Sequence, residues 1–326
     1  MMEGVYVCRA CRTRLSLLPR TARRALSTTT ASPASNTSEQ SKIPLSSLTP
    51  SDLSYYWETT IPDASQLAYA DKFFAPSRHS PVKLWSASKF RTLPLESIEP
   101  EVAFLGRSNV GKSSLLNAIM GQEMCYTSAH PGRTREMNAF GIGGTKGGES
   151  KIVLLDMPGY GKASRAEWGT EIMKYLQGRK QLRRAFLLVD SLHGLKDNDR
   201  DILALFRQYA IPHQIILSKV DRILAKKGKP IKGGVTASKI QELRAILHGL
   251  RPQVQPKGRL EGPGALGEIL TCSAETRVDK GKTTPLGVSA IRWSILTAAG
   301  FGGSVEVKTA PPSQAATTLS KSAIAA

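Results

Sequence analysis

Two glycines, a lysine and a serine at close spacing give this chain a segment suited to binding phosphate groups: Gly106, Gly111, Lys112 and Ser113. An apolar run, residues 102–105, precedes the segment, and a stretch with helical spacing, residues 114–120, follows it. Glycines let backbone N–H groups approach phosphate oxygens without a Cβ in the way. The lysine can reach the terminal phosphates, and the serine hydroxyl can bind Mg²⁺. Strand, glycine-rich turn and helix in this order predict a P-loop, a cradle for a nucleoside triphosphate.

The predicted cradle includes the residues between and just after these four. Its members are Gly106, Arg107, Ser108, Asn109, Val110, Gly111, Lys112, Ser113 and Ser114. An ordinary glycine-rich turn is the alternative interpretation, and it leaves the flanking strand and helix unexplained.

A second apolar run, residues 152–155, ends in Asp156, and Gly159 follows three residues later. A carboxylate at this position can hold Mg²⁺ through a water molecule. The Gly159 N–H can contact the γ-phosphate and respond to its loss. The pattern therefore predicts a second phosphate-binding segment.

Two further apolar runs end in polar residues that suit a guanine base. Residues 214–217 lead into Ser218, Lys219 and Asp221, and residues 269–272 lead into Ser273 and Ala274. Guanine has two adjacent donors that one carboxylate can accept, and adenine has no such pair, so Asp221 would select GTP over ATP. The Lys219 stem can cover the base, and the N–H groups at Ser273 and Ala274 can meet its carbonyl oxygen.

All four motifs follow apolar runs that we expect to be strands. In a doubly wound α/β sheet, ligands bind at the carboxyl ends of the strands. The order of the motifs therefore predicts a P-loop NTPase fold of the small GTPase kind, with a mainly parallel six-stranded sheet and helices on both faces.

From about residue 101 to about residue 300 the chain resembles the EngB (YihA/YsxC) GTPases of the Era/TrmE/septin-like P-loop group. The resemblance rests on residues 101–117, on Pro131-Gly-Arg-Thr134, on residues 156–161 and on Val189-Asp190-Ser. It implies that Thr134, next to Gly132 in the switch segment, closes on Mg²⁺ and the γ-phosphate, so that Ser113, Thr134 and Asp156 serve the metal. Ser218 departs from the family, which usually has Thr there, and we expect somewhat weaker base binding.

Hydrolysis is expected to be slow without help. Many GTPases place a glutamine after the Asp-x-x-Gly glycine, where it orients the attacking water, but this chain has Tyr160. A phenol cannot replace the amide in that role. In related potassium-dependent GTPases an asparagine at the position of Asn109 helps to hold K⁺. Lys112, Thr134 and Asn109 are therefore the candidate catalytic residues, with Asn109 as a turn residue the alternative.

The amino-terminal segment has the composition of an organellar transit peptide. Residues 1–38 contain six arginines, one acidic residue and many serines and threonines. We expect a transit peptide over 1–27 and a mitochondrial matrix protein; a basic arm that binds nucleic acid is the alternative. No run has the length of a membrane span. A lone Cys-x-x-Cys at Cys8 and Cys11 cannot complete a zinc site.

The remaining boundaries follow from composition. We expect a disordered linker over 28–50, an extension over 51–97, a G domain over 98–303 and a disordered tail over 304–326. The extension is rich in aromatic residues, among them Tyr55, Tyr56, Trp57, Phe73, Phe74, Trp85 and Phe90. Packing on the G domain is the favoured interpretation of these aromatics, and a partner-docking surface is the alternative.

The net charge of +19 indicates a polyanionic partner. Residues 1–38 contribute +5, which leaves about +14 for the rest of the chain. Two basic clusters are candidates for RNA contact: Arg179, Lys180, Arg183 and Arg184, and Lys226, Lys227, Lys229 and Lys232.

From the resemblance we expect a monomeric GTPase that cycles between GTP and GDP and assists assembly of the large ribosomal subunit by binding its precursor of rRNA and ribosomal proteins. A nucleotide-dependent structural or division protein is the main alternative. A tRNA-modifying GTPase would need an additional catalytic domain.

Overall fold

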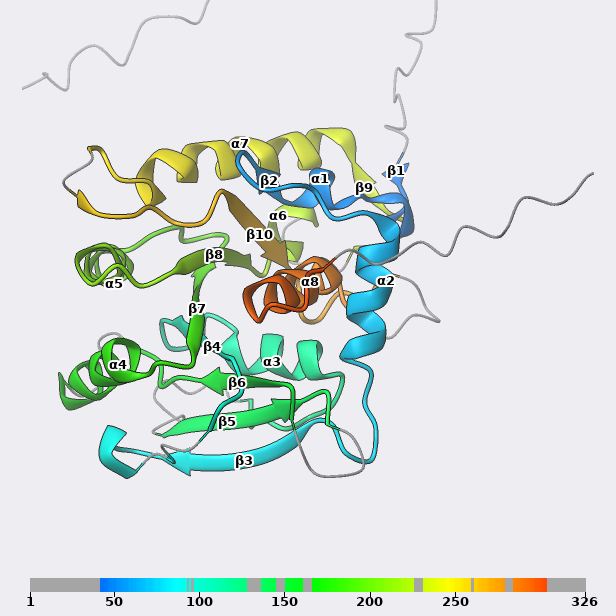
Figure 1. Cartoon of the computed structure of the whole chain (residues 1–326). Coiled ribbons are helices and arrows are strands. Elements are labelled where there is room, and N and C mark those ends of the chain that lie inside the picture. The colour runs from blue at the N-terminus through cyan, green and yellow to red at the C-terminus, as the bar shows by residue number, and fades with distance from the viewer. Residues whose placement is uncertain are drawn as a thin grey trace, which may run out of the picture. The chain divides into compact units, whose positions relative to one another are not determined.

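The protein's structure is a computed structural model (Figure 1). The described residues are 42–92, 94, 97–127, 136–144, 150–160, 166–225, 231–258, 261–278 and 284–303. The predicted transit peptide, the tail, the switch residues Gly132 and Thr134, and three of the cluster lysines (Lys226, Lys227 and Lys229) lie outside them.

An eight-stranded sheet, in the order β2-β10-β8-β7-β4-β6-β5-β3, organises the molecule. Its strands are β2 (Tyr55–Tyr56), β3 (Val82–Ala87), β4 (Glu101–Gly106), β5 (Met137–Ile142), β6 (Ile152–Asp156), β7 (Leu182–Asp190), β8 (His213–Ser218) and β10 (Glu268–Cys272). The five central strands, from β10 to β6, pair in parallel, and β2, β5 and β3 pair antiparallel. A separate two-stranded sheet pairs β1 (Lys42–Ile43) with β9 (Val235–Thr236).

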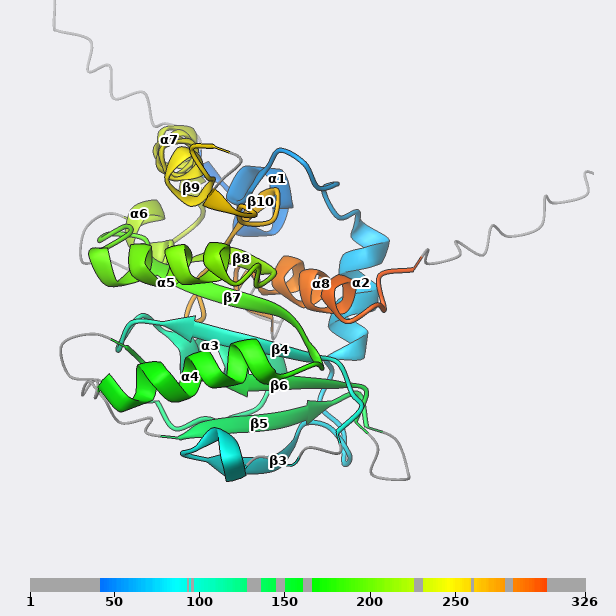
Figure 2. The same cartoon turned by 60° about the vertical axis from the view of Figure 1, so that its left-hand side comes forward.

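Helices cover both faces of the sheet (Figure 2). They are α1 (Pro50–Leu53), α2 (Ala64–Phe73), α3 (Lys112–Met120), α4 (Ala166–Gly178), α5 (Asp197–Gln208), α6 (Asp221–Leu224), α7 (Ala237–Val254) and α8 (Val288–Ala298), with short 3-10 turns at Leu45–Ser47 and Phe90–Thr92. Buried residues of α4, α5, α6 and α7 belong to one hydrophobic cluster, and those of α2, α3 and α8 belong to another.

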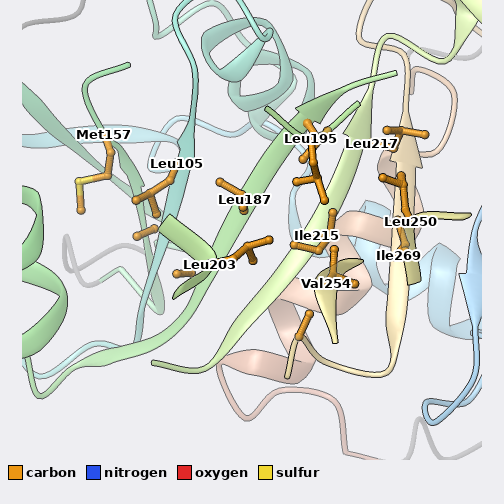
Figure 3. Close-up of a cluster of buried hydrophobic side chains, with 14 of the residues drawn as sticks. Leu105, Met157, Leu187, Leu195, Leu203, Ile215, Leu217, Leu250, Val254 and Ile269 are labelled. Carbon is orange, nitrogen blue, oxygen red and sulfur yellow. The ribbon is translucent and has the colours of Figure 1, made fainter. Parts of the chain in front are cut away.

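Alternating side chains of the central strands supply both clusters. In β7, Leu187 and Val189 belong to the cluster of α4, α5 and α7, whereas Phe186 and Leu188 belong to the cluster of α3 and α8. Figure 3 shows the first cluster, where Leu187 lies beside Leu105 of β4 and Ile215 of β8. Successive strand residues point to opposite faces, so a strand buried on both faces must be apolar throughout. The apolar runs of the sequence meet this requirement.

The fold class predicted from the sequence is confirmed, but the number of strands is not six. Six strands of the sheet come from the predicted G domain, and β2 and β3 come from the segment before it. Strand β3 pairs with β5 from Val82 to Ala87, and β2 pairs with β10 through Tyr55 and Tyr56. Strand β2 has only two residues and β3 is mostly exposed, so neither has the strong hydrophobic pattern of a buried strand that the sequence could reveal.

The segment before the G domain makes extensive contacts with it. Helix α2 packs on α8, where Arg292 Nη1 donates to Asp71 Oδ1 at 2.8 Å. The seven aromatic residues named from the sequence are buried or partly buried against the two clusters, whereas an eighth, Tyr69 of α2, is exposed. Residues 42–50, expected in a disordered linker, instead form β1, a 3-10 turn and the start of α1. Their apolar side chains, Ile43, Leu45 and Leu48, pack against the first cluster, which offsets the entropy lost on ordering.

Buried charges meet at the amino-terminal ends of the parallel strands. The Glu101 carboxylate, at the start of β4, accepts hydrogen bonds from Arg179 Nη2 at 2.7 Å, from Arg179 Nε and from the Tyr175 hydroxyl. Arg184 Nη1 donates to Gln214 Oε1 at 2.8 Å and lies over the Phe186 ring.

These contacts correct the first basic cluster proposed from the sequence. Arg179 is buried and Arg184 is partly buried, with polar partners inside the protein, so neither is available to RNA phosphates. Lys180 and Arg183 are exposed, and so is Lys232 of the second cluster. Within the described part of the chain, no helix is both long enough and apolar enough to cross a membrane.

Candidate functional site

The four motifs identified in the sequence lie at the carboxyl ends of β4, β6, β8 and β10. These strands end at Gly106, Asp156, Ser218 and Cys272. Hydrogen bonds join the motifs: Ser113 Oγ donates to Asp156 Oδ2 at 3.4 Å, and Ser218 Oγ donates to the Val110 carbonyl at 2.8 Å. The predicted phosphate and base segments therefore form one site at one edge of the sheet.

The turn between β4 and α3 has the backbone conformation of a cradle. Asn109 has φ +62°, and Gly111, which precedes the first residue of α3, has φ +105°. Left-handed conformations of this kind favour glycine and are tolerated by asparagine. A Cβ at Gly106 would lie 2.8 Å from Val110 Cγ1, so only glycine fits at the start of the turn. The turn leads directly into the amino terminus of α3, where backbone N–H groups and the helix dipole favour an anion.

Lys112 and Asp156 carry opposite charges into the interior beside this turn. The Lys112 side chain is buried, and its Nζ donates to the Gly106 carbonyl at 3.1 Å. Burial lowers the pKa of Lys112, and the neighbouring Asp156 opposes that shift. Burial also raises the pKa of Asp156 to about 6, although Lys112 and Ser113 act in the opposite direction.

One oxygen of Asp156, Oδ1, is buried without a hydrogen-bond partner among the described residues. A buried carboxylate oxygen without a partner is costly and invites a cation or a donor. A carboxylate and a hydroxyl are the ligand types that Mg²⁺ prefers, so Asp156 and Ser113 fit a magnesium site. Thr134, the third metal residue expected from the resemblance, lies outside the described residues, as does Gly132.

Gly159 lies against the cradle. A Cβ at Gly159 would come within 2.9 Å of Ser108 Oγ and 3.0 Å of Ser108 N, so the close approach of the two segments requires glycine. Ser108 N donates to the Tyr160 carbonyl at 3.1 Å, which ties the segments through their backbones. The Tyr160 hydroxyl donates to Asp199 Oδ1 at 2.7 Å, which places the phenol against α5.

At the base end of the site, Ser218 and Lys219 hold the cradle from the side. The Ser218 hydroxyl is buried and contacts the Val110 and Val189 carbonyls. Lys219, with φ +58°, reaches the Asn109 carbonyl at 2.5 Å and Asp190 Oδ2 at 3.0 Å. From the sequence Ser218 is expected among the base-binding residues, and the structure shows that its hydroxyl supports the backbone of the cradle.

Asp221 and the segment Ser273–Ala274 lie side by side because Val220 N donates to the Cys272 carbonyl at 3.2 Å. The Asp221 carboxylate makes no hydrogen bond or ion pair within the described residues, so its oxygens are available to a base. Ser273 N donates to the Leu286 carbonyl, and Ser273 Oγ lies 3.0 Å from Thr276 Oγ1. The polar groups of Ser273 thus shape the loop, and the Ala274 N–H is the better candidate for the guanine oxygen.

Two aspartates support the site without having been identified as site residues from the sequence. Asp190, at the end of β7, accepts from Lys219, from His193 Nδ1 at 3.0 Å and from Leu192 N. Burial would raise the pKa of Asp190, but these hydrogen bonds outweigh it, so the pKa lies below its usual value. Because Asp190 is a carboxylate at the end of an apolar run, as Asp156 is, the sequence could have identified it as a site residue.

Asp199 gave a different signal. It lies on the buried face of α5 with Leu203 and Phe206, at a spacing where an apolar residue would be expected. A fully buried acidic residue on such a face needs a partner, and the partners of Asp199 belong to the site.

Comparisons with known proteins agree with this geometry. A family model described as "50S ribosome-binding GTPase" matches residues 101–219. A probable GTP-binding protein EngB of Rhizobium johnstonii is 42% identical over 185 residues, which cover 54% of this chain and 82% of the relative. A probable GTP-binding protein EngB of Bartonella bacilliformis is 38% identical over 208 residues, which cover 61% of this chain and 84% of the relative.

Among solved structures, the crystal structure of a probable GTP-binding protein engB aligns with a TM-score of 0.39 and 20% identity, over 61% of this chain and 98% of that chain. The sequence relatives carry the assignment, because the chain covers more than two thirds of both EngB proteins at well above 30% identity. The resemblance and the GTPase activity predicted from the sequence are thereby confirmed, and the chain belongs to the EngB family of GTP-binding GTPases.

Proposed function

We propose that this GTPase is a nucleotide-controlled switch in the assembly of the large ribosomal subunit of mitochondria. The observation that carries the proposal is the match of residues 101–219 to a family described as ribosome-binding GTPases of the 50S subunit. The net charge of +19 supports a polyanionic partner such as rRNA. The arginine-rich, acid-poor composition of residues 1–38 supports import into the mitochondrial matrix.

The chemistry of the site suits GTP with Mg²⁺. Ser113 and Asp156 would hold the metal, together with Thr134, and the bound Mg²⁺ would neutralise charge on the terminal phosphates. Lys112 would contact the same phosphates from the cradle. Asp221 would select guanine, and Lys219 would cover the base.

The hydrolysis step is expected to be slow unless a cation or a partner assists it. Tyr160 is engaged by Asp199 and is not placed to orient water as a glutamine does. We propose K⁺ as the assisting cation, held with the help of Asn109. Rates measured in K⁺ and in Na⁺ test this: the unmutated protein should be faster in K⁺, and Asn109→Ala should abolish the difference. Equal rates in the two salts would refute it.

RNA contact is proposed for the exposed part of the two basic clusters. Lys180 and Arg183 remain from the first cluster after the burial of Arg179 and Arg184. Lys232 of the second cluster is exposed, and Lys226, Lys227 and Lys229 belong to the same proposal. Phosphate contacts release counterions, so binding through these side chains must weaken steeply with salt.

Sedimentation of mitochondrial lysate tests the function. With a non-hydrolysable GTP analogue the protein should migrate with large-subunit precursors, and with GDP it should remain at the top of the gradient. A Lys180→Ala, Arg183→Ala variant and a variant with alanine at the four lysines of the second cluster should bind GTP normally but show a flatter salt dependence. Nucleotide-dependent polymers free of RNA would instead favour the structural or division role. Tracing a fluorescent fusion that lacks residues 1–27 tests the localisation.

A further inference from the structure

A buried carboxylate outside the four motifs joins two loops of the nucleotide site. Asp199 has no exposed side-chain surface, and its two oxygens have different partners. Oδ1 accepts from the Tyr160 hydroxyl at 2.7 Å, and Oδ2 lies 3.2 Å from Arg107 Nε. Arg107 is the second residue of the cradle, and Tyr160 directly follows Gly159. One carboxylate of α5 therefore contacts both segments that border the expected position of the terminal phosphate.

The location of Asp199 in α5 makes it a stable anchor. It is the third residue of the helix, and its Oδ2 also accepts from Lys196 N at 2.9 Å, which closes the first turn. Leu203 and Phe206, on the same face of α5, are buried in the first hydrophobic cluster. The carboxylate is thus held by the scaffold on one side and presented to the two loops on the other.

The partners of Asp199 show that this is more than a neutralised buried charge. Burying a carboxylate is costly unless it is paired and hydrogen-bonded, and a scaffold residue would serve that need equally well. Here both side-chain partners come from loops of the nucleotide site. The same loops are joined by the hydrogen bond from Ser108 N to the Tyr160 carbonyl and by the close approach of Gly159 to Ser108.

We propose that Asp199 is a positioning residue that sets the spacing between the cradle and Gly159 and thereby favours GTP over GDP. Through Tyr160 it holds the Gly159 N–H near the cradle, and through Arg107 it holds the cradle itself. The Gly159 N–H can contact only the γ-phosphate, which GDP lacks. Loss of the Asp199 contacts must therefore weaken GTP binding and leave GDP binding nearly unchanged.

The test uses the full chain and three single variants. Tyr160→Phe removes only the hydroxyl that donates to Asp199, and Asp199→Asn keeps the volume but removes the charge that faces Arg107. Asp197→Asn is the matched control, because Asp197 lies on the same turn of α5 with its side chain 98% exposed. Titration with fluorescent analogues of GTP and GDP gives both affinities, and steady-state hydrolysis gives KM and kcat.

In Tyr160→Phe and Asp199→Asn the ratio of GTP affinity to GDP affinity should fall about fivefold or more, the usual range for coupling between elements. Affinity for GDP and kcat at saturating GTP should stay within about twofold, a difference of less than 1 kcal/mol, because the phenol does not orient water. Asp197→Asn should behave like the unmutated protein. A fourth variant that combines Tyr160→Phe with Asp199→Asn should show less than the sum of the two single effects, since both changes break one contact.

Three results would overturn the proposal. An equal loss of GTP and GDP affinity would mean that Asp199 merely supports the fold. Unchanged affinities would mean that the contact is irrelevant to nucleotide binding. A gain in GTP affinity would mean that it holds a conformation unfavourable to GTP. Should Asp199→Asn fail to fold in a thermal unfolding control, Tyr160→Phe decides the matter, because its ring still fills the same space.

Discussion

At the start of β4 the buried Glu101 carboxylate receives hydrogen bonds from Arg179 and from Tyr175, whereas at the end of the adjacent β6 one oxygen of the buried Asp156 has no partner among the described residues. Both carboxylates are almost inaccessible to solvent. The first is matched by cationic and neutral donors of the protein itself. The second faces Lys112 and Ser113 without being fully satisfied by them.

The difference separates a structural charge from a functional one. A buried ion pair whose hydrogen bonds are all made within the protein requires no ligand. Removal of one member is strongly destabilising, because it leaves the other as an uncompensated buried charge. A buried charge with an open oxygen is destabilising until a ligand completes it. The charges at the amino-terminal edge of the sheet therefore stabilise the fold, and the open oxygen of Asp156 at the carboxyl-terminal edge fits the proposed nucleotide and metal site.

The largest effect is expected from removing a partner at the amino-terminal edge. Arg179→Met should lower the free energy of unfolding by about 3–5 kcal/mol, because Glu101 loses its counter-charge in the interior. Arg183→Met, at an exposed position nearby, should change it by less than about 0.5 kcal/mol. Urea unfolding measures both. Similar losses in the two variants would contradict the assignment of Arg179 as a buried structural charge.

For Asp156, in contrast, we expect the negative charge to destabilise the folded protein. Its pKa of about 6 in the folded protein lies above its ordinary value of 3.8, so the folded state binds the extra proton. In the nucleotide-free protein, stability should therefore fall as the pH rises from about 4 to about 6 and level off above that, by on the order of 3 kcal/mol in total.

Urea unfolding from pH 4 to pH 8 tests this, with Asp156→Asn as the reference that lacks the titrating group. The difference between the two proteins should change within that window and not beyond it. Parallel profiles of stability against pH for the two proteins would show that folding does not raise the pKa of Asp156. Metal ligands must be deprotonated, so Mg²⁺-dependent GTP affinity should fall below about pH 6.

Lys112→Ala should separate binding from stability. Loss of a charged contact to the phosphates should weaken GTP binding by roughly 10- to 100-fold. The free energy of unfolding should fall by less than in Arg179→Met, since burial disfavours the charge of Lys112 and lowers its pKa, although Asp156 loses a neighbouring opposite charge. Fluorescence titration and urea unfolding give the two quantities, with exposed Lys180→Ala as the control. A loss of stability without a loss of affinity would place Lys112 with the structural charges.

The smallest expected effect concerns the base. Asp221→Asn replaces one acceptor by a donor and should weaken GTP binding about tenfold while it improves the binding of xanthosine triphosphate. Competition of unlabelled nucleotides against labelled GDP measures the change. The assignment would fail if ATP competed as well as GDP in the unmutated protein.

Local motifs allowed much of the site to be predicted. The cradle, the Asp156–Gly159 segment and the segment of Ser218, Lys219 and Asp221 all follow apolar strands, and the structure places them at one edge. Such motifs are visible because backbone conformation at Gly111 and the reach of Lys112 are properties of a few consecutive residues. The role of the Ser218 hydroxyl was not visible, since its partner Val110 lies 108 residues away.

The first basic cluster shows most clearly what could not be predicted from the sequence. Arg179, Lys180, Arg183 and Arg184 form one run of positive charge in the sequence, yet two of them turn inward and two remain exposed. Arg179 and Arg184 turn inward because they form hydrogen bonds with Glu101 of β4 and Gln214 of β8, which are distant in the sequence. The same holds for β2 and β3, whose place at the margins of the sheet depends on their partners β10 and β5.

The sequence by itself predicted GTP binding, which the family assignment confirms, and it identified the segments that we expect to contact the nucleotide, because glycines, a lysine and carboxylates recur there at fixed short spacings. Only the tertiary structure decided which buried charges make all their hydrogen bonds within the protein and which, like Asp156, keep an oxygen without a partner among the described residues. That distinction depends on distances between segments far apart in the chain, as the contacts of Asp199 with Arg107 and Tyr160 show. Burial makes each such contact, or its absence, energetically decisive.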